Sequence, residues 1–374
     1  MTFLQKYLKE DEKAIYNLRA LYSDYGYTRY KVNQFEEYDL YAKNKSFLVS
    51  ENLLTFTDTN GKLMALKPDV TLSIIKNVVS DERSIYKLFY DEQVYRTTSN
   101  GDGFKEIRQT GLESIGNLDL FSECEVLMLA MKSLENISQE YLLDLSHMGL
   151  LEGLFEEIGV QSCDIPEFLS LIGAKNLHGL SLLCSEYGIA ENDAQALCEL
   201  TAMYLPIGEA LKKISSLIRG EKMSGAFEEL AEIFKIMKLY GLDQKLYMDF
   251  SVVNDMNYYD GIIFNGFINN IPDSVLSGGR YDRMMERFGK KTGAIGFAVY
   301  LDRLERIGAD IDIFDVDYLL LYDDSSTEDI VRTVAELSKD GSSVRTQNNF
   351  DSNIRYRNLV KLGKDGSYTL ETNG

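Results

Sequence analysis

The sequence predicts an α+β fold with an antiparallel sheet, a helical insertion and a short C-terminal α/β module. Two strand-like runs at 87–96 and 104–116 flank a loop with Asn and Gly residues, which favours an antiparallel hairpin. Residues from about 150 to 245 contain several segments with helical periodicity, and residues 315–374 have the order strand, helix, strand. The length of 374 residues suits two or three domains, so we expect a core over 1–310 and a separate module after it.

Before the hairpin, the sequence favours a helix, a strand pair and a second helix. Apolar residues between 15 and 22 have helical spacing, and Gly26 follows them as a C-terminal stop. Short strand-like runs surround the turn sequence TDTNGK. Residues 71–79 have the pattern of a helix that begins near Asp69 or Thr71.

After the hairpin, helical periodicity over 119–136 predicts a long helix. Two further strands are expected at 246–253 and 258–268. The sequence SGGRYD at 277–282 predicts a turn, and residues 296–307 are expected to form a helix.

The charge balance argues against general binding of nucleic acid. The chain has 39 Lys and Arg against 59 Asp and Glu, a net charge of -20, so any contact with nucleic acid would have to be local. Its first residues carry charges among apolar positions, unlike a signal peptide, and no apolar run approaches the roughly 18 residues that span a bilayer. We therefore expect a cytoplasmic protein without membrane contact.

Cysteine and histidine offer no metal site. The four cysteines form no CxxC pair and only two histidines are present, so the ligand spacing of a zinc site is missing. We expect no metal and no cofactor, and we interpret His147 and His178 as structural. The thiols are expected to be reduced and buried; they belong to Cys124, Cys163, Cys184 and Cys198.

The second strand of the hairpin carries the first candidate site residues. Side chains alternate along a strand, so Gln109, Gly111 and Glu113 share one face. A glycine within a strand often marks the close approach of a ligand or another backbone, although a half-exposed sheet face with a bulge explains the same spacing. Arg96, which ends the first strand, can hold a carboxylate or phosphate, or form a surface ion pair.

Two further pairs of residues have the same ambiguity. Asp69 and Thr71 lie at a strand-to-helix turn, where a carboxylate and a hydroxyl serve equally as a helix cap or as ligand contacts. Tyr258 and Tyr259 precede a strand, and because adjacent strand residues face opposite sides, at most one of them is expected to face a pocket.

Taken together and in this order, six segments resemble the histidyl-tRNA synthetase family of class II aminoacyl-tRNA synthetases. The resemblance spans roughly 300 residues and implies an antiparallel sheet flanked by helices, normally built as a dimer. The segments are LKPDVT at 66–71, VYR at 94–96, IRQTGLESIG at 107–116, NYYDGIIF at 257–264, SGGRYD at 277–282 and GFAVYLDRL at 296–304.

The resemblance also implies a histidine pocket. Its carboxylates can neutralise an ammonium and an imidazole proton, while its arginine can bind a carboxylate. The matching positions in this sequence are Asp69, Thr71, Arg96, Gln109, Glu113, Tyr258 and Tyr259.

Residues that the synthetases use for adenylation are replaced. Asn254 stands where the synthetases have an arginine, Thr98 where they have a glutamate, and Gly103 where they have an arginine in the loop. Arg303 is kept. The proline of the first motif is replaced by Asn33, which bears on the dimer contact. The C-terminal segment also matches only the first half of an anticodon-binding domain.

A kept histidine pocket with lost adenylation residues resembles the regulatory subunits of ATP phosphoribosyltransferase. The resemblance implies a noncatalytic subunit that activates a short-form catalytic partner in the first step of histidine biosynthesis and senses histidine for feedback inhibition. The alternative is an enzyme, either a divergent histidyl-tRNA synthetase or another adenylate-forming amino-acid ligase. A purely structural scaffold would not explain why the pocket residues remain together.

Overall fold

The computed structural model describes residues 8, 10–44, 52–78, 84–98, 103–252, 258–306 and 314–372. The chain divides into two compact units. Glu10–Glu305 form the larger unit, and Arg306–Gly374 belong to the smaller one.

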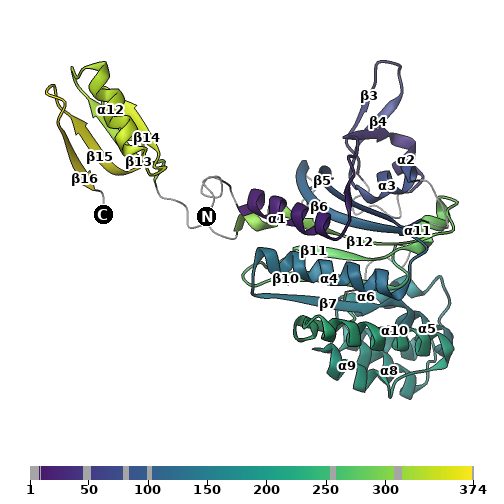
Figure 1. Ribbon diagram of the computed structural model, residues 1–374. Helices are drawn as coiled ribbons and strands as arrows, with labels where there is room; N and C mark the ends of the chain where they lie inside the picture. Colours follow the sequence, from purple (N-terminus) through teal and green to yellow (C-terminus); the bar gives the residue numbers. More distant parts are fainter. Residues whose placement is uncertain are drawn as a thin grey trace. The chain divides into compact units, whose positions relative to one another are not determined.

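The core of the larger unit is a nine-stranded, mainly antiparallel sheet (Figure 1). Only the pairs β1/β5 and β7/β9 are parallel. In spatial order the strands are β1 (Thr28–Arg29), β5 (Tyr86–Thr97), β6 (Phe104–Gly116), β12 (Gly293–Tyr300), β11 (Leu276–Arg280), β10 (Ile262–Ile268), β7 (Tyr141–His147), β9 (Leu246–Asp249) and β8 (Tyr204–Pro206). The hairpin of β5 and β6 confirms the prediction for that segment and places Gln109 and Glu113 in the middle of the sheet.

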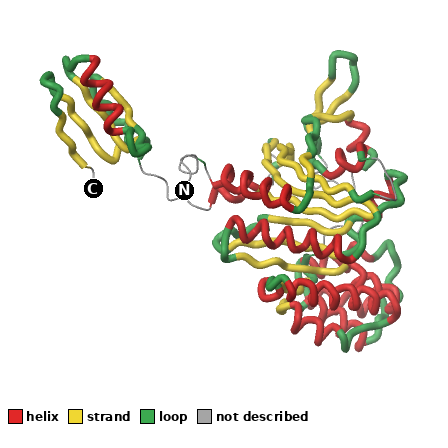
Figure 2. Tube along the Cα trace, viewed as in Figure 1, coloured by secondary structure: helices red, strands yellow, loops and turns green. Residues whose placement is uncertain are grey.

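Two helices pack side by side against this sheet (Figure 2). Helix α1 (Glu10–Asp24) buries its predicted apolar positions, and Gly26 follows with a φ of 80°. Helix α4 (Leu120–Ile137) begins at Asp119, whose carboxylate accepts the backbone N–H of Ser122. Both helices agree with the sequence prediction to within a few residues.

A small sheet and two short helices precede the hairpin. The predicted TDTNGK turn connects β3 to β4. The elements are β2 (Phe35–Glu37), α2 (Tyr38–Ala42), β3 (Thr55–Thr57), β4 (Leu63–Leu66) and α3 (Thr71–Asn77).

The helical insertion contains six helices and the short strand β8, which joins the sheet edge. Figure 1 shows most of its helices on the side of β7 that faces away from β5 and β6. The elements are α5 (Met148–Ile158), α6 (Ile165–Gly173), α7 (Leu177–Glu186), α8 (Glu191–Thr201), α9 (Ile207–Ile214), α10 (Gly220–Leu239) and the 3-10 helix η3 (Asp243–Lys245).

Two predictions near the end of the larger unit are wrong. Residues 277–280 do not form a turn but belong to strand β11, and helix α11 (Asp282–Arg287) follows. Gly278 is required by packing, because a Cβ there would lie 2.4 Å from the carbonyl oxygen of Gly296. Residues 296–300 are likewise strand β12 rather than helix, and only the 3-10 helix η4 (Leu301–Arg306) follows them.

The smaller unit contains a four-stranded sheet with one helix. The predicted order of strand, helix and strand is confirmed, and the structure adds two strands that the sequence did not reveal. The elements are β13 (Val316–Tyr322), α12 (Thr327–Leu337), β14 (Val344–Gln347), β15 (Tyr356–Leu362) and β16 (Tyr368–Thr372).

The four cysteines are free thiols, but burial was predicted correctly for only two of them. Cys124 and Cys184 are buried, Cys163 is exposed and Cys198 is intermediate. None of the described helices combines the length and apolar character that crossing a membrane requires.

Candidate functional site

A cavity of about 330 Å³ collects the candidate site residues of the larger unit. All seven predicted positions line it, together with Arg303. The strands β5, β6, β10, β11 and β12 supply most of the wall. The start of α3, the 3-10 helix η4 and the segments that flank β10 and β11 supply the rest. The remaining lining residues are Tyr90, Asn265, Ser274, Ser277, Tyr281, Gly296, Phe297, Ala298 and Tyr300.

Glu113 lies in the wall of this cavity and is 2% exposed. Its carboxyl group accepts a hydrogen bond of 2.8 Å from the Thr71 hydroxyl and another from the Tyr281 hydroxyl. Burial raises the pKa of Glu113 to about 8, although both hydroxyls act in the opposite direction. Burial therefore favours the neutral form of this carboxyl group, and a cation bound beside it would favour ionisation.

Gly296 makes room for the Glu113 carboxyl group. The two residues are paired across β12 and β6, and a Cβ on Gly296 would lie 1.8 Å from Glu113 Oε2. Gly111 has a similar role, because a Cβ there would lie 2.6 Å from the Tyr90 hydroxyl. The mid-strand glycine thus marks a close approach of other groups, as one of the two sequence interpretations held.

Replacing Gly296 by Ala should destabilise the protein by about 1 to 3 kcal/mol, because the added methyl group overpacks a closed site. Urea denaturation of the two forms measures this difference. Gly225→Ala is the matched control, since a Cβ at this position in α10 meets nothing within 4 Å. Equal losses in the free energy of unfolding in both variants would show that the space beside Glu113 is not tightly filled.

Asp69 combines the two functions that its position suggested. Its Oδ1 accepts the backbone N–H of Leu72 at 2.9 Å in the first turn of α3, and the residue also lines the cavity. Burial raises the pKa of the Asp69 carboxyl group, while the Leu72 N–H and the nearby Arg96 act against that rise. Capping and ligand contact are therefore compatible at this residue.

Arg96 is fixed by the turn that precedes α3. Its Nε donates a 2.9 Å hydrogen bond to the carbonyl oxygen of Pro68. Since Nε is engaged there, a ligand carboxylate would meet the two Nη groups.

Gln109 supplies an unused donor. The side chain is 2% exposed, and its Nε2 has no hydrogen-bond partner among the described residues. Asn265 also lines the cavity, and its Oδ1 likewise lacks a partner within the described part of the chain. Buried polar atoms of this kind are seldom left unsatisfied, so the cavity is prepared for a polar ligand.

Both tyrosines of the predicted pair line the cavity, so the expectation that only one would do so is wrong. The ring centroids of Tyr258 and Tyr259 are 4.4 Å apart, and Tyr258 also lies 5.9 Å from Tyr281. The alternation of a strand does not apply here, because β10 begins only at Ile262.

A second part of the wall surrounds Arg303. Its guanidinium lies 4.3 Å from the ring centroid of Tyr300 and donates to the carbonyl oxygen and the hydroxyl of Ser274. The Tyr300 hydroxyl is 2.6 Å from the Ser277 hydroxyl. Of these residues only Ser274 lies outside the sequence motifs that carried the family resemblance.

Where the structure describes them, the positions that depart from the synthetase pattern supply no charge to the cavity. Thr98 and Gly103 pair with each other at the base of the β5/β6 loop, with the Thr98 N–H 3.0 Å from the Gly103 carbonyl oxygen. Asn33 is exposed before β2. Asn254 lies outside the described residues.

Comparison with known proteins identifies relatives of two kinds. Residues 3–304 match the protein family described as histidyl-tRNA synthetase. An ATP phosphoribosyltransferase regulatory subunit from Ruminiclostridium cellulolyticum is 26% identical over 369 residues, which cover 95% of this chain and 87% of that protein. Another from Clostridium kluyveri is 29% identical over 335 residues, covering 87% and 85%.

Solved structures share the fold. A structure of an ATP phosphoribosyltransferase regulatory subunit/histidyl-tRNA synthetase from Bacillus halodurans matches with a TM-score of 0.77 and 22% identity, covering 95% of this chain and 94% of that one. A chain of an ATP phosphoribosyl transferase complex from Thermotoga maritima matches with a TM-score of 0.61 and 19% identity, covering 78% and 97%. These matches confirm the predicted class II synthetase-like α+β fold, and the sequence relatives confirm the resemblance to the regulatory subunits.

Proposed function

The chain belongs to the histidyl-tRNA synthetase family, and we propose that it is a noncatalytic regulatory subunit of ATP phosphoribosyltransferase that binds histidine. The observation that carries this proposal is the cavity around Glu113, which keeps the seven expected residues together while the described adenylation positions have lost their charged side chains. The names of the sequence relatives support the regulatory assignment.

The polar groups of the cavity match the groups of a histidine molecule. The carboxyl groups of Asp69 and Glu113 suit its ammonium and imidazole N–H donors. Arg96 and the unpaired Nε2 of Gln109 suit its carboxylate, which needs donors. The tyrosine pair encloses a flat aromatic ring by offset or tilted packing.

The proposed partners are a short-form catalytic subunit and a second copy of this chain. The Thermotoga maritima neighbour belongs to an ATP phosphoribosyl transferase complex, which supports a partnership of the first kind. The dimer rests on the resemblance to class II synthetases. We place the assembly in the cytoplasm as part of the same proposal.

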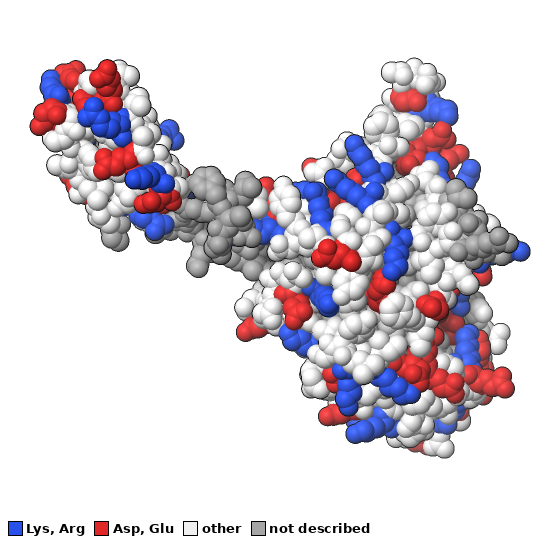
Figure 3. Space-filling view, in the orientation of Figure 1, with Lys and Arg blue, Asp and Glu red and all other residues white. Residues whose placement is uncertain are grey.

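We propose no role in binding tRNA. A net charge of -20 disfavours contact with a phosphate backbone. On the face drawn in Figure 3, Lys and Arg side chains lie among Asp and Glu over both units. The smaller unit, proposed as a truncated relative of an anticodon-binding domain, shows both signs of charge in this view.

Histidine-dependent exchange of pyrophosphate into ATP should be absent. The synthetase alternative needs preorganised cations that stabilise the reacting carboxylate and phosphate, and losing one such group typically costs about 100-fold to 1000-fold in rate. An exchange assay on the purified protein, with a working histidyl-tRNA synthetase as positive control, measures this activity. Exchange at a comparable rate would favour the enzyme over the regulator.

A further inference from the structure

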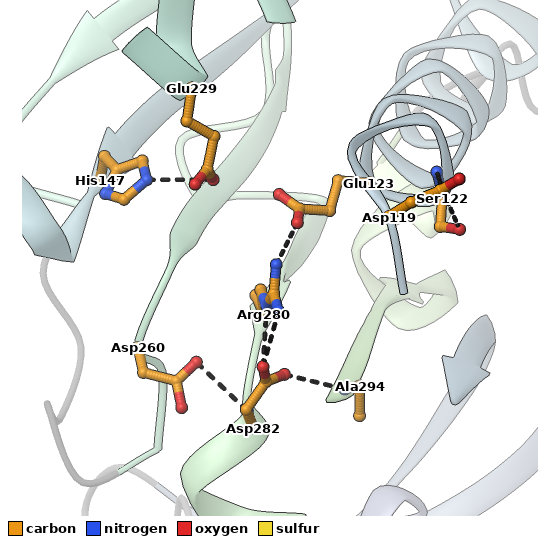
Figure 4. A network of polar contacts seen from close by, with 9 residues as sticks. All are labelled: Asp119, Ser122, Glu123, His147, Glu229, Asp260, Arg280, Asp282 and Ala294. Atoms are coloured by element: carbon orange, nitrogen blue, oxygen red, sulfur yellow. Dashed lines mark hydrogen bonds and ion pairs between the residues drawn. The ribbon is translucent and has the colours of Figure 1, made fainter. Parts of the chain in front are cut away.

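A second cluster of charged side chains lies where the helical insertion meets the sheet (Figure 4). Arg280, at the end of β11, donates to Glu123 of α4 and to Asp282, the latter at 2.7 Å. Glu229 of α10 accepts a hydrogen bond of 3.1 Å from His147 at the end of β7. The cluster therefore connects the insertion with the central part of the sheet.

The carboxyl groups of Glu123 and Glu229 face each other within this cluster (Figure 4). The Glu123 side chain is 3% exposed; its Oε1 binds Arg280, and its Oε2 has no donor among the described groups. Two ionised carboxylates that face each other would repel, and the repulsion is screened only in part, because Glu123 is buried while the Glu229 side chain is 30% exposed. A single proton between them removes this repulsion and supplies the missing donor.

His147 is not placed to supply that proton. Its Nδ1 accepts the backbone N–H of Gly149 at 3.0 Å and so caps α5. This leaves Nε2 as the protonated nitrogen that donates to Glu229.

The other charged groups around the pair are engaged elsewhere or lie outside it. The Asp119 carboxylate caps α4, Lys235 pairs with Glu232, and Glu152 binds Lys222 and Arg283. The titratable and charged groups that surround the pair are Asp119 and Cys124 from α4, His147 from β7, Glu152 from α5, Glu228, Glu232 and Lys235 from α10, Asp260 before β10, Arg280 from β11 and Asp282 and Arg283 from α11.

We propose that Glu123 and Glu229 share one proton and that this proton fastens the helical insertion to the sheet core. The proton resides mainly on Glu123. Burial and then the charge of Glu229 raise the pKa of Glu123 to about 8. Burial also acts to raise the pKa of Glu229, but its contacts with His147, Glu123 and Arg280 together lower it.

The contact between Glu123 and Glu229 should therefore weaken as pH rises. When α10 separates from α4, Glu123 meets water and its pKa returns towards the ordinary glutamate value of 4.5. Below that value both the closed and the open form hold the proton, whereas between it and about 8 only the closed form does. The stabilising contribution is complete at low pH and is lost as pH rises to about 8.

Hydrogen exchange of residues 220–239 tests the proposal with the ligand-free full chain. After correction for intrinsic exchange, the opening equilibrium constant of the wild type should rise by up to about tenfold per pH unit from about pH 5.5 to about pH 8. In Glu123→Gln the amide oxygen accepts from Arg280 and the amide NH2 donates to Glu229, so the contact remains without a titrating group. This variant should lose the pH slope and be better protected than the wild type at about pH 8.

Glu228→Gln is the matched control, because Glu228 is exposed on the same helix, and it should keep the wild-type slope. Equal slopes in the wild type and Glu123→Gln would overturn the proposal. If Glu123→Gln fails to fold, Glu229→Gln gives the same test, since its amide can donate to Glu123 and accept from His147. An unchanged slope in Glu229→Gln would likewise overturn the shared proton.

Discussion

Adding this chain to a short-form ATP phosphoribosyltransferase catalytic subunit from the same cell should raise a low basal rate of phosphoribosyl transfer by at least about fivefold, the lower end of typical coupling between sites. A noncatalytic subunit can activate its partner only by binding the active state more tightly than the inactive one. Histidine should then lower the rate of the complex and leave the basal rate of the catalytic subunit unchanged. Initial rates measured with and without each component give both effects.

The control for activation is a variant that is altered only in the proposed histidine site. Glu113→Gln should activate the partner as the wild type does, because activation is assigned to the assembled complex and not to the bound ligand. If the rate and its histidine sensitivity do not change when this chain is added, the regulatory assignment is wrong.

Replacing Glu113 by Gln should weaken histidine binding by about one to two orders of magnitude. The amide keeps the shape of the side chain but removes the charge that completes a hydrogen bond to a cationic ligand group. Losing such a bond costs about 1.5 to 3 kcal/mol, and roughly 1.4 kcal/mol corresponds to a factor of ten in the dissociation constant. Calorimetric titrations of the wild type and the variant measure the difference.

The loss of histidine affinity in Glu113→Gln should depend on pH in a defined direction. Burial raises the pKa of Glu113 to about 8, so at lower pH a cationic group must displace the proton that Glu113 holds. The ratio of wild-type to variant affinity should therefore increase as pH rises towards about 8. The exposed Glu106 on the same strand provides the control, and Glu106→Gln should bind histidine as the wild type does.

Two outcomes would contradict this assignment of Glu113. One is an unchanged histidine affinity in Glu113→Gln. The other is a variant that loses feedback inhibition only when it also fails to assemble with the partner, which would make Glu113 a structural residue.

The sequence predicted those elements whose signals are local. The alternating pattern of β5 and β6, the apolar spacing of α1 and the TDTNGK turn each specify their own conformation, and the structure agrees with them. The errors arose where a distant partner decides the conformation. Gly278 and Gly296 are characteristic of a turn or a helix start when only their neighbours are considered, but both allow close strand packing in the middle of the sheet.

The candidate site could be predicted only in part, because some of its contacts join residues that are far apart in the sequence. Its seven residues lie in motifs of a recognisable family, so their order in the sequence was enough to group them. Tyr281, by contrast, donates to Glu113 across 168 positions of the chain, and no local pattern announces that contact. The carboxyl pair of Glu123 and Glu229 was missed likewise, because each residue is an ordinary polar position on its own helix.

The histidine pocket is the central claim, and calorimetric titration of the isolated chain with histidine tests it most directly. The account predicts saturable binding of one histidine per chain in the absence of ATP, with a dissociation constant that Glu113→Gln increases. A parallel titration with ATP shows whether the nucleotide is needed. Absence of heat with histidine alone, or binding that appears only after ATP is added, would contradict the account and favour a synthetase-like enzyme.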